Sequence, residues 1–218
     1  MNNSSNEESA TTDDDDGLIE FIPPSIEELV IVKAPEHDEV LRPNIIFSDE
    51  LIPSFILGET DIRVELKHLV MLQQAAIAIL AQAQREILLV SPDLEHERFD
   101  NPAFVEALSA FARSSRYTKT QILLADPRLA IEDGHRVIKL MRRLSSLIEI
   151  RQLHENDIEH SEAMLVADNI GLLRCTNRDP WQGSLLPKGT PYAQQARERF
   201  LTWWERGSEI SDFRELKI

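Results

Sequence analysis

The sequence predicts an α/β fold, a layered sandwich in which a mostly parallel sheet is flanked by helices. Two observations from Asp61 onward predict it. Short apolar runs of strand length alternate with longer segments whose apolar residues recur every three or four positions. The strand-like runs stop at Ser-Pro and Asp-Pro turn signals. Strands and helices that alternate in this way form right-handed crossovers between parallel strands, with the helices lying on the sheet.

The first part of this pattern contains a helix, a strand and a second helix. Val64–Ala83 has the apolar spacing of a long amphipathic helix. Ile87–Val90 is a continuous apolar run, as expected of a strand buried in a parallel sheet. Asn101 as N-cap and Pro102 at the first helical position predict a helix that ends near Ser115.

The middle of the pattern repeats this alternation. Gln121–Ala125 predicts a second strand, which the Asp126-Pro127 turn signal ends. Asp133–Leu144 has a helical apolar stripe, and Ile148–Leu153 alternates as a third strand.

The last part of the pattern predicts a hairpin and a final helix. Ala163–Ala167 and Gly171–Cys175 flank an Asp-Asn pair, which is typical of a tight turn between two strands. The segment from Pro180 to Pro187 is expected to be a loop. Thr190-Pro191 then starts a helix, and Gly207 lies where a C-terminal glycine belongs.

Charge divides the chain into two regions. Residues 1–60 hold fifteen acidic side chains against Lys33 and Arg42, whereas residues 61–218 hold twenty-three acidic and twenty-one basic ones. High net charge with few apolar side chains does not offset the entropy lost on ordering. We therefore expect an acidic, proline-containing, largely disordered or extended arm over residues 1–60. Residues 61–218 suit one α/β domain.

The apolar clusters of the arm have two interpretations. Its five prolines between positions 23 and 53 exclude long regular elements. The clusters are either parts of an extended segment that lies over the domain or a partner-binding motif around Leu18–Ile22 or Leu29–Val32.

Composition excludes several classes of protein. Cys175 is the only cysteine, which excludes disulfide frameworks and cysteine-based zinc sites. The N-terminus lacks the basic and apolar regions of a signal peptide. The apolar run Ala75–Ala81 is too short to span a membrane. We therefore expect a cytoplasmic protein without a membrane span.

The stretch His160-Ser-Glu-Ala-Met-Leu-Val-Ala-Asp168 contains the one reaction-like motif. Together with the strand–helix alternation over residues 64–207, it resembles a half-domain of the phospholipase D superfamily, whose strand carries His, Lys and Asp (HKD). The resemblance implies that His160 corresponds to a histidine that attacks phosphorus, that a lysine holds the phosphoryl oxygens and that two halves build one site. The region is also similar to an uncharacterised bacterial domain sometimes found beside an acetyltransferase domain.

The motif departs from the superfamily pattern in three ways, so it is degenerate. Glu162 stands where lysine is expected, or Ala163 when the alignment is anchored on Asp168, which lies one residue too far from His160. The usual Gly-Ser falls on Cys175-Thr176, and the chain contains no second motif. A carboxylate in place of an ammonium reverses the charge that faces a phosphate. This reversal argues against phosphoryl transfer.

The candidate ligand-binding residues lie mostly where strands end, since ligands of α/β sheets bind beyond the carboxyl ends of strands. The first candidates are Ser91 and Asp93. His135 and Arg136, at a helix start, form either an anion cradle or an ordinary N-cap. His154 and Asp168 are further candidates, although such an aspartate also caps turns.

No metal or cofactor is expected, because the spacing of His154, Glu155, Asp157 and His160 matches no specific metal site. Nucleic acid is an unexpected partner, because the domain is close to neutral and the arm is acidic. One of the adjacent Trp203 and Trp204 is expected in the core. The other, together with Trp181, is a candidate for an interface or a pocket wall, which hints at a homodimer or a protein partner.

Two functions follow as hypotheses. The first is a non-catalytic binding or interaction module built on a single phospholipase D-like domain. The alternative is a divergent phosphodiesterase or nuclease-like hydrolase that works as a homodimer through His160. A weaker third hypothesis is that the acidic arm mimics nucleic acid and regulates binding.

Overall fold

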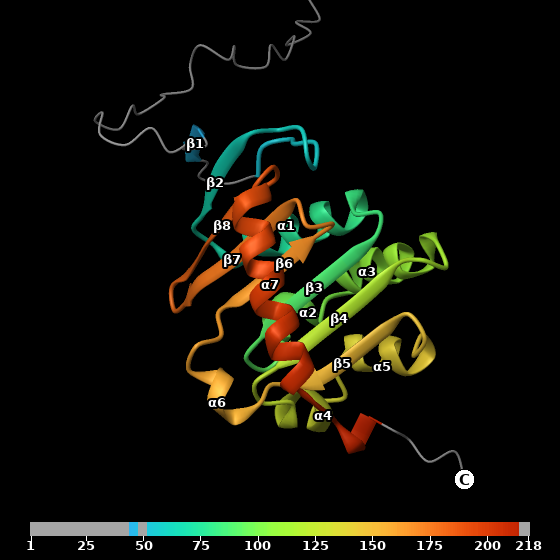
Figure 1. Cartoon of the computed structure of the whole chain (residues 1–218). Coiled ribbons are helices and arrows are strands. Elements are labelled where there is room, and N and C mark those ends of the chain that lie inside the picture. The colour runs from blue at the N-terminus through green and yellow to red at the C-terminus, as the bar shows by residue number, and fades with distance from the viewer. Residues whose placement is uncertain (1–43, 48–51, 214–218) are drawn as a thin grey trace, which may run out of the picture. The chain divides into compact units, whose positions relative to one another are not determined.

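The computed structural model describes residues 44–47 and 52–213, so most of the predicted arm lies outside the described residues. Within them, nine strands form one sheet in the order β1-β2-β8-β7-β6-β3-β4-β5-β9 (Figure 1). The strands are β1 Asn44–Phe47, β2 Ile62–Leu66, β3 Glu86–Ser91, β4 Lys119–Leu124, β5 Ile148–Gln152, β6 Ala163–Ala167, β7 Gly171–Arg178, β8 Trp181–Leu186 and β9 Ser208–Glu209. The helices are α1 Leu69–Gln82, α2 His96–Phe99, α3 Pro102–Ser114, α4 Arg128–Glu132, α5 Arg136–Arg143, α6 Glu155–Ile158 and α7 Thr190–Arg206.

The sheet is mostly antiparallel, so the prediction of a mostly parallel sheet is wrong. β1 pairs in parallel with β2. β4 pairs in parallel with β3 on one side and with β5 on the other. Strands β6, β7 and β8 follow one another through short hairpins, which make neighbouring strands antiparallel, and this set lies between β2 and β3. The order of helices and strands along the chain does not reveal where such a hairpin set inserts.

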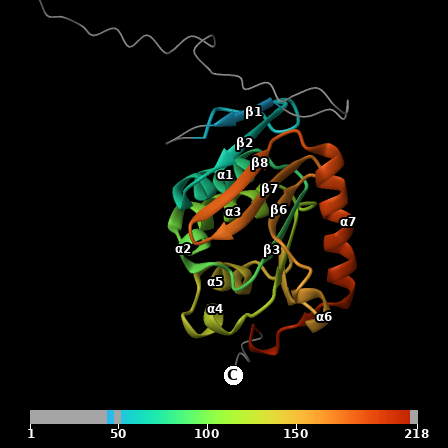
Figure 2. The ribbon, with the colours of Figure 1, turned by 90° about the vertical axis from the view of Figure 1, so that its left-hand side faces the viewer.

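One face of the sheet carries a core shared with α1, α3 and α5 (Figures 1 and 2). Ile87 and Leu89 of β3 point to this face. The predicted inward residues of α3, namely Phe104, Leu108 and Phe111, are all buried in it. The start of α3 is confirmed, because the Asn101 Oδ1 accepts a hydrogen bond from the Phe104 N–H at 2.8 Å.

The opposite face is covered by α7, which Figure 2 shows on the other side of the sheet from α1 and α3. Leu88 and Val90 of β3 point into this second core, as the alternation of strand side chains requires. Trp203 and Trp204 are both buried there, and Trp204 stacks on Phe200 with ring centroids 5.6 Å apart. The expectation that one of these two tryptophans forms an interface or a pocket wall is therefore wrong, because both lie in the core.

Two segments differ from their predicted structure. Residues 64–66 belong to strand β2 rather than to the first helix, which begins at Leu69. Val64 and Leu66 are buried and alternate with Arg63 and Glu65, whose side chains pair at 2.7 Å. This two-residue period is the signature of a strand.

The predicted loop between Pro180 and Pro187 is strand β8. Its glycine, Gly183, lies against β7 so closely that a Cβ would stand 2.2 Å from the Arg174 carbonyl oxygen. A glycine in a strand often marks such a close backbone approach. Among the described residues, none forms a helix long and apolar enough to cross a membrane.

Candidate functional site

The carboxyl end of β3 leads into a strained and polar turn. Ser91 is fully buried, and its Oγ accepts a hydrogen bond from the Leu94 N–H at 2.9 Å and lies 3.4 Å from Glu95 Oε2. Leu94 and Glu95 have φ angles of 66° and 28°, in the region that non-glycine residues rarely adopt. Such strain persists where surrounding contacts enforce it, and it clusters at functional sites.

The turn holds a buried ion pair between Glu95 and Arg98. The Arg98 Nη1 lies 3.2 Å from the Glu95 Oε2, and both side chains are fully buried. Arg98 Nε and Nη2 and Glu95 Oε1 have no hydrogen-bond partner among the described residues. Burial raises the pKa of Glu95, and the positive charges of Arg98 and Arg178 oppose this shift. The chain therefore keeps an expensive pair of charges away from water at this point.

Three small residues, Ser91, Ala163 and Cys175, lie side by side on neighbouring strands next to this ion pair. Val90 pairs with Met164, which places Ser91 beside Ala163, and Ala163 pairs with Cys175 of β7. The buried Cys175 thiol donates to the Asn177 carbonyl at 3.3 Å, and burial raises its pKa. A raised pKa keeps the thiol protonated and therefore a poor nucleophile.

Arg178 at the end of β7 connects the buried pair to solvent. Its Nη2 lies 3.2 Å from Asp93 Oδ2, and its Nε lies 3.9 Å from Glu95 Oε1. The side chain is 43% exposed, and its guanidinium lies 5.8 Å from the centroid of the Trp181 ring. One arginine thus contacts two carboxylates, one of them buried, and an aromatic ring.

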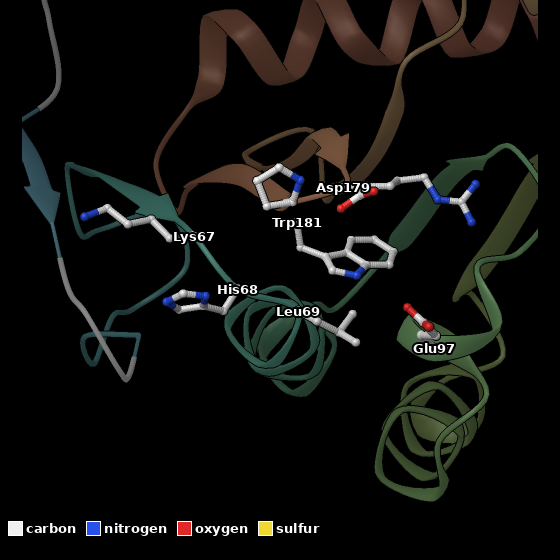
Figure 3. Close-up of a pocket in the computed structure, with 8 residues that line it drawn as sticks. Lys67, His68, Leu69, Glu97, Asp179 and Trp181 are labelled. Atoms are coloured by element: carbon white, nitrogen blue, oxygen red, sulfur yellow. The ribbon is translucent and has the colours of Figure 1, made fainter.

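A cleft of about 440 Å³ opens beside Arg178. Figure 3 shows the Trp181 indole between Asp179 and the start of α1, with His68 and Glu97 on opposite sides of it. Acidic, basic and apolar side chains all contribute to the lining, which consists of Lys67, His68, Leu69, Glu97, Arg178, Asp179, Pro180 and Trp181. The cleft therefore joins the β2–α1 junction, α2 and the β7–β8 hairpin.

The predicted anion cradle at His135 and Arg136 already holds a carboxylate of the chain itself. Asp100 Oδ1 accepts a hydrogen bond from the Arg136 N–H at 2.7 Å, and Asp100 Oδ2 lies 3.1 Å from Arg136 Nη1. The His135 ring is buried, and its Nδ1 caps α5 by accepting from the Val137 N–H at 3.1 Å. Burial lowers the pKa of His135 to about 4, against the opposing charge of Asp100.

His154 and His160 lie around the short helix α6, away from contact with the buried pair. His154 is exposed and caps α6 through the Asn156 N–H at 3.3 Å. His160 is exposed, and its N–H donates to the Asp157 carbonyl at 3.2 Å. Glu162, which stands at the lysine position of the motif, pairs with Arg199 at 2.6 Å and Arg174 at 3.7 Å.

Asp168 lies at the opposite end of β6 from the turn that contains His160. Its carboxylate accepts three backbone hydrogen bonds at the start of β3, from Gln84 at 2.7 Å, Arg85 at 2.7 Å and Glu86 at 2.9 Å. These bonds tie the β6–β7 turn to the neighbouring strand.

Of the predicted site residues, the structure brings Ser91 and Asp93 together with Glu95, Arg98 and Arg178. It places His135 and Arg136 around Asp100, and His154, His160 and Asp168 elsewhere. Sequence reasoning did not single out Glu95, Arg98 or Arg178. One signal for Arg178 was available, since Arg-Asp-Pro-Trp lies between two apolar runs and forms the turn of a hairpin. Within the described ranges, no three His, Cys, Asp or Glu side chains gather as a possible metal site.

The fold of the domain is α/β and phospholipase D-like. Residues 68–216 match the family described as Domain of unknown function (DUF7931), and the chain belongs to that family. None of the curated proteins compared with the sequence matches it.

Solved structures share the fold at low sequence identity. TrmBL2, an archaeal chromatin protein, is 17% identical over 70% of this chain and 55% of its own, with a TM-score of 0.52. Phosphatidylserine synthase from Haemophilus influenzae Rd KW20 is 12% identical over 72% of this chain and 41% of its own, with a TM-score of 0.51. The chain thus spans about half the length of these two proteins or less. Nuc from Salmonella typhimurium, a phospholipase D family member, is 16% identical over 62% and 88% of the two chains, with a TM-score of 0.46.

Proposed function

We propose that this domain is a non-catalytic binding module on a phospholipase D-like scaffold. The observation that carries the proposal is the buried Glu95–Arg98 pair, which lies over the strand ends beside Ser91 and Cys175. A reacting phosphoryl group needs room and unengaged donors near its nucleophile. Here the Glu95 and Arg98 side chains occupy these strand ends and are fully buried. The Nε and Nη2 of Arg98, which have no hydrogen-bond partner among the described residues, are therefore not accessible to a phosphoryl group from solvent.

The residues at the motif support the same role. Ala163 offers only a methyl group, and the Glu162 carboxylate is engaged by Arg199 and Arg174. Neither position supplies a cation to a phosphate, where a lost donor in an active site costs about 3–4 kcal/mol of transition-state stabilisation. The exposed His160 therefore lacks the electrostatic partner that phosphoryl transfer requires.

The accessible feature is the cleft beside Arg178, which combines an aromatic wall with charged groups of both signs. Concave sites of this kind bind small molecules or short segments through a few placed polar contacts. Because one fold supports many functions, similarity to a synthase or to a chromatin protein does not assign an activity.

The test is turnover of bis(p-nitrophenyl) phosphate and of single- and double-stranded DNA by the full chain. We expect hydrolysis at the level of the buffer, equal in the wild-type chain and in the His160→Ala variant. Hydrolysis that His160→Ala abolishes, while the exposed-histidine control His154→Ala retains it, would overturn the proposal.

A homodimeric hydrolase that works through His160 is the second candidate. The observation that favours it is the exposure of His160 on the turn before β6, where a second chain can reach it. This candidate requires a dimer in solution whose two His160 side chains approach each other. Sedimentation analysis, followed by cross-linking of His160→Cys in a Cys175→Ser background, tests both requirements. A monomer, or a dimer that does not cross-link, contradicts it.

A further inference from the structure

The position of Arg178 between a buried carboxylate and the cleft has a consequence for the ligand. The side chain lines the cleft, and its Nε and Nη2 face Glu95 and Asp93. A guanidinium carries five N–H donors in a planar fork, which matches the two oxygens of a carboxylate or phosphate. Lys67 and Arg178 both line the cleft, and Arg178 is the one whose planar fork suits the two oxygens of an oxyanion.

Glu95 is held to Arg178 only weakly. Its Oε2 pairs with Arg98 at 3.2 Å, whereas its Oε1 is 3.9 Å from Arg178 and has no hydrogen-bond partner among the described residues. A buried oxygen without a hydrogen bond is a cost to the fold. The contact between Glu95 and Arg178 is therefore one that a better-placed oxyanion can replace without breaking a short hydrogen bond.

Two further features of the cleft favour an anion beside a flat apolar group. The 14-residue helix α1 begins there, and its N-cap residue His68 provides no side-chain cap. The N–H groups of an uncapped first turn attract negative charge. Trp181 supplies an aromatic wall, and Leu69 and Pro180 add apolar surface.

Two acidic residues of the cleft limit the charge of the ligand. Glu97 and Asp179 are exposed and line the same cleft as Arg178. Their charges are partly screened by solvent and salt, yet they oppose a dianion more strongly than a monoanion. A polyanion such as nucleic acid is disfavoured for the same reason.

From this geometry we propose that the cleft binds a small aromatic monoanion, with Arg178 contacting its oxyanion and Glu95 acting as an internal competitor for Arg178. This inference rests on the binding role proposed above and specifies its ligand class. Carboxylates and singly charged phosphate esters share the required chemistry, and the experiment separates them.

The experiment measures binding to the full chain by titration calorimetry and by NMR of the Trp181 indole N–H, assigned with Trp181→Phe. The probes are benzoate, the singly charged diester methyl phenyl phosphate, the monoester phenyl phosphate and inorganic phosphate. We expect benzoate to shift the Trp181 signal and to bind more tightly than phenyl phosphate, which is largely dianionic at neutral pH. Inorganic phosphate lacks the aromatic ring and should bind most weakly.

Three variants test the assigned roles. Arg178→Gln should weaken benzoate binding by about tenfold or more, because it removes a charged hydrogen-bond donor. Arg113→Gln removes an exposed arginine of α3 that does not line the cleft, and should leave binding unchanged. Glu95→Gln should tighten binding, because the amide keeps the shape of the side chain but no longer attracts Arg178.

The possible failures can be told apart. Equal benzoate affinity in wild type and Arg178→Gln would overturn the inference, as would absence of binding in both wild type and Glu95→Gln. Binding of inorganic phosphate as tight as that of benzoate would overturn the aromatic part of the ligand class. None of these results involves turnover, so they leave the proposed non-catalytic role to its own test.

Discussion

The Asp100 carboxylate closes the N-terminus of α5 by accepting the Arg136 N–H at 2.7 Å. Asp100 also pairs with the Arg136 guanidinium, and its side chain is only 9% exposed. Two segments that are far apart in the sequence, the loop after α2 and the start of α5, are thereby joined by one side chain.

Replacing Asp100 with Ala should lower the free energy of unfolding by about 1–2 kcal/mol, because the end of α5 loses both a cap and a compensating charge. Urea unfolding followed by circular dichroism measures the difference. Glu132→Ala, which removes an exposed carboxylate near the same helix, is the matched control and should stay within about 0.5 kcal/mol of wild type. Equal losses in the two variants would contradict the capping role.

His135 should make the stability of the fold depend on pH. Its pKa falls from an ordinary 6.5 to about 4 in the folded chain, so the folded state keeps it neutral. As the pH falls below about 6.5, His135 becomes protonated in the unfolded chain but stays neutral in the folded chain. The free energy of unfolding therefore decreases down to about pH 4. His135→Asn can still accept the Val137 N–H and cannot titrate. Between pH 7 and pH 4 it should lose less stability than wild type; identical pH profiles in urea titrations would refute this.

The Glu95–Arg98 pair predicts strong non-additivity. Arg98→Met strands a buried carboxylate and should cost about 3–5 kcal/mol of stability. Adding Glu95→Gln removes that charge, so the double variant should be more stable than the sum of the single changes implies. A double-mutant cycle by urea unfolding gives the coupling energy, and a value near zero would show that the two side chains do not depend on each other.

The same pair also predicts a pH trend. Because burial raises the pKa of Glu95 above 4.5, its contribution to stability is full below that pH and is lost as the pH rises through the folded-state pKa. Wild type should therefore lose stability relative to Glu95→Gln as the pH rises from about 4.5 through the raised folded-state pKa of Glu95. The comparison cancels the titration of His135, which both proteins retain. A constant difference across the range would argue against a raised pKa of Glu95 in the folded chain.

Asp168 is expected to act on stability through its three backbone hydrogen bonds. Asp168→Ala leaves the N–H groups of Gln84, Arg85 and Glu86 without this acceptor and should cost about 2–4 kcal/mol. Asp168→Asn keeps one acceptor oxygen and tolerates the positive φ of 52°, so its loss should be smaller. Asp133→Ala, at an exposed position, is the control. Equal stability of the Ala and Asn variants would be incompatible with this role.

Local signals predicted much of the fold. The Asn101-Pro102 start of α3, the continuous runs of β3 and β4 and the turn at Asp168 each depend on neighbouring residues, and all appear in the structure. The phospholipase D-like architecture was expected from the resemblance of residues 64–207 to that superfamily, whereas the alternation alone predicted a mostly parallel sheet.

The errors came from features that depend on distant contacts. Residues 64–66 were assigned to a helix because Leu66, Leu69 and Val70 follow the helical spacing of three to four residues. In the structure they form strand β2, which pairs with β8. β8 was predicted as a loop because two prolines flank it and it contains Gly183. The reason for that glycine is its close approach to the backbone of Arg174, which the sequence does not reveal. The site was found in part, because Ser91 and Asp93 follow a strand. Glu95 and Arg98 are charged residues of the kind usually exposed, and their burial depends on how β3, β6 and β7 meet.

The order of the sheet also sets when the fold can be completed during synthesis. Val64 of β2 pairs with Leu185 of β8, and β6 pairs with β3. A nascent chain that has passed β5 can assemble β3, β4 and β5, yet β2 still lacks its neighbour β8 in the middle of the sheet. Non-local pairing of this kind slows folding, because the loop must close before the contacts form. The β6–β8 segment therefore connects β2 to β3 and completes the middle of the sheet. Ribosome-stalled chains that end before residue 187 should leave β2 open to proteolysis.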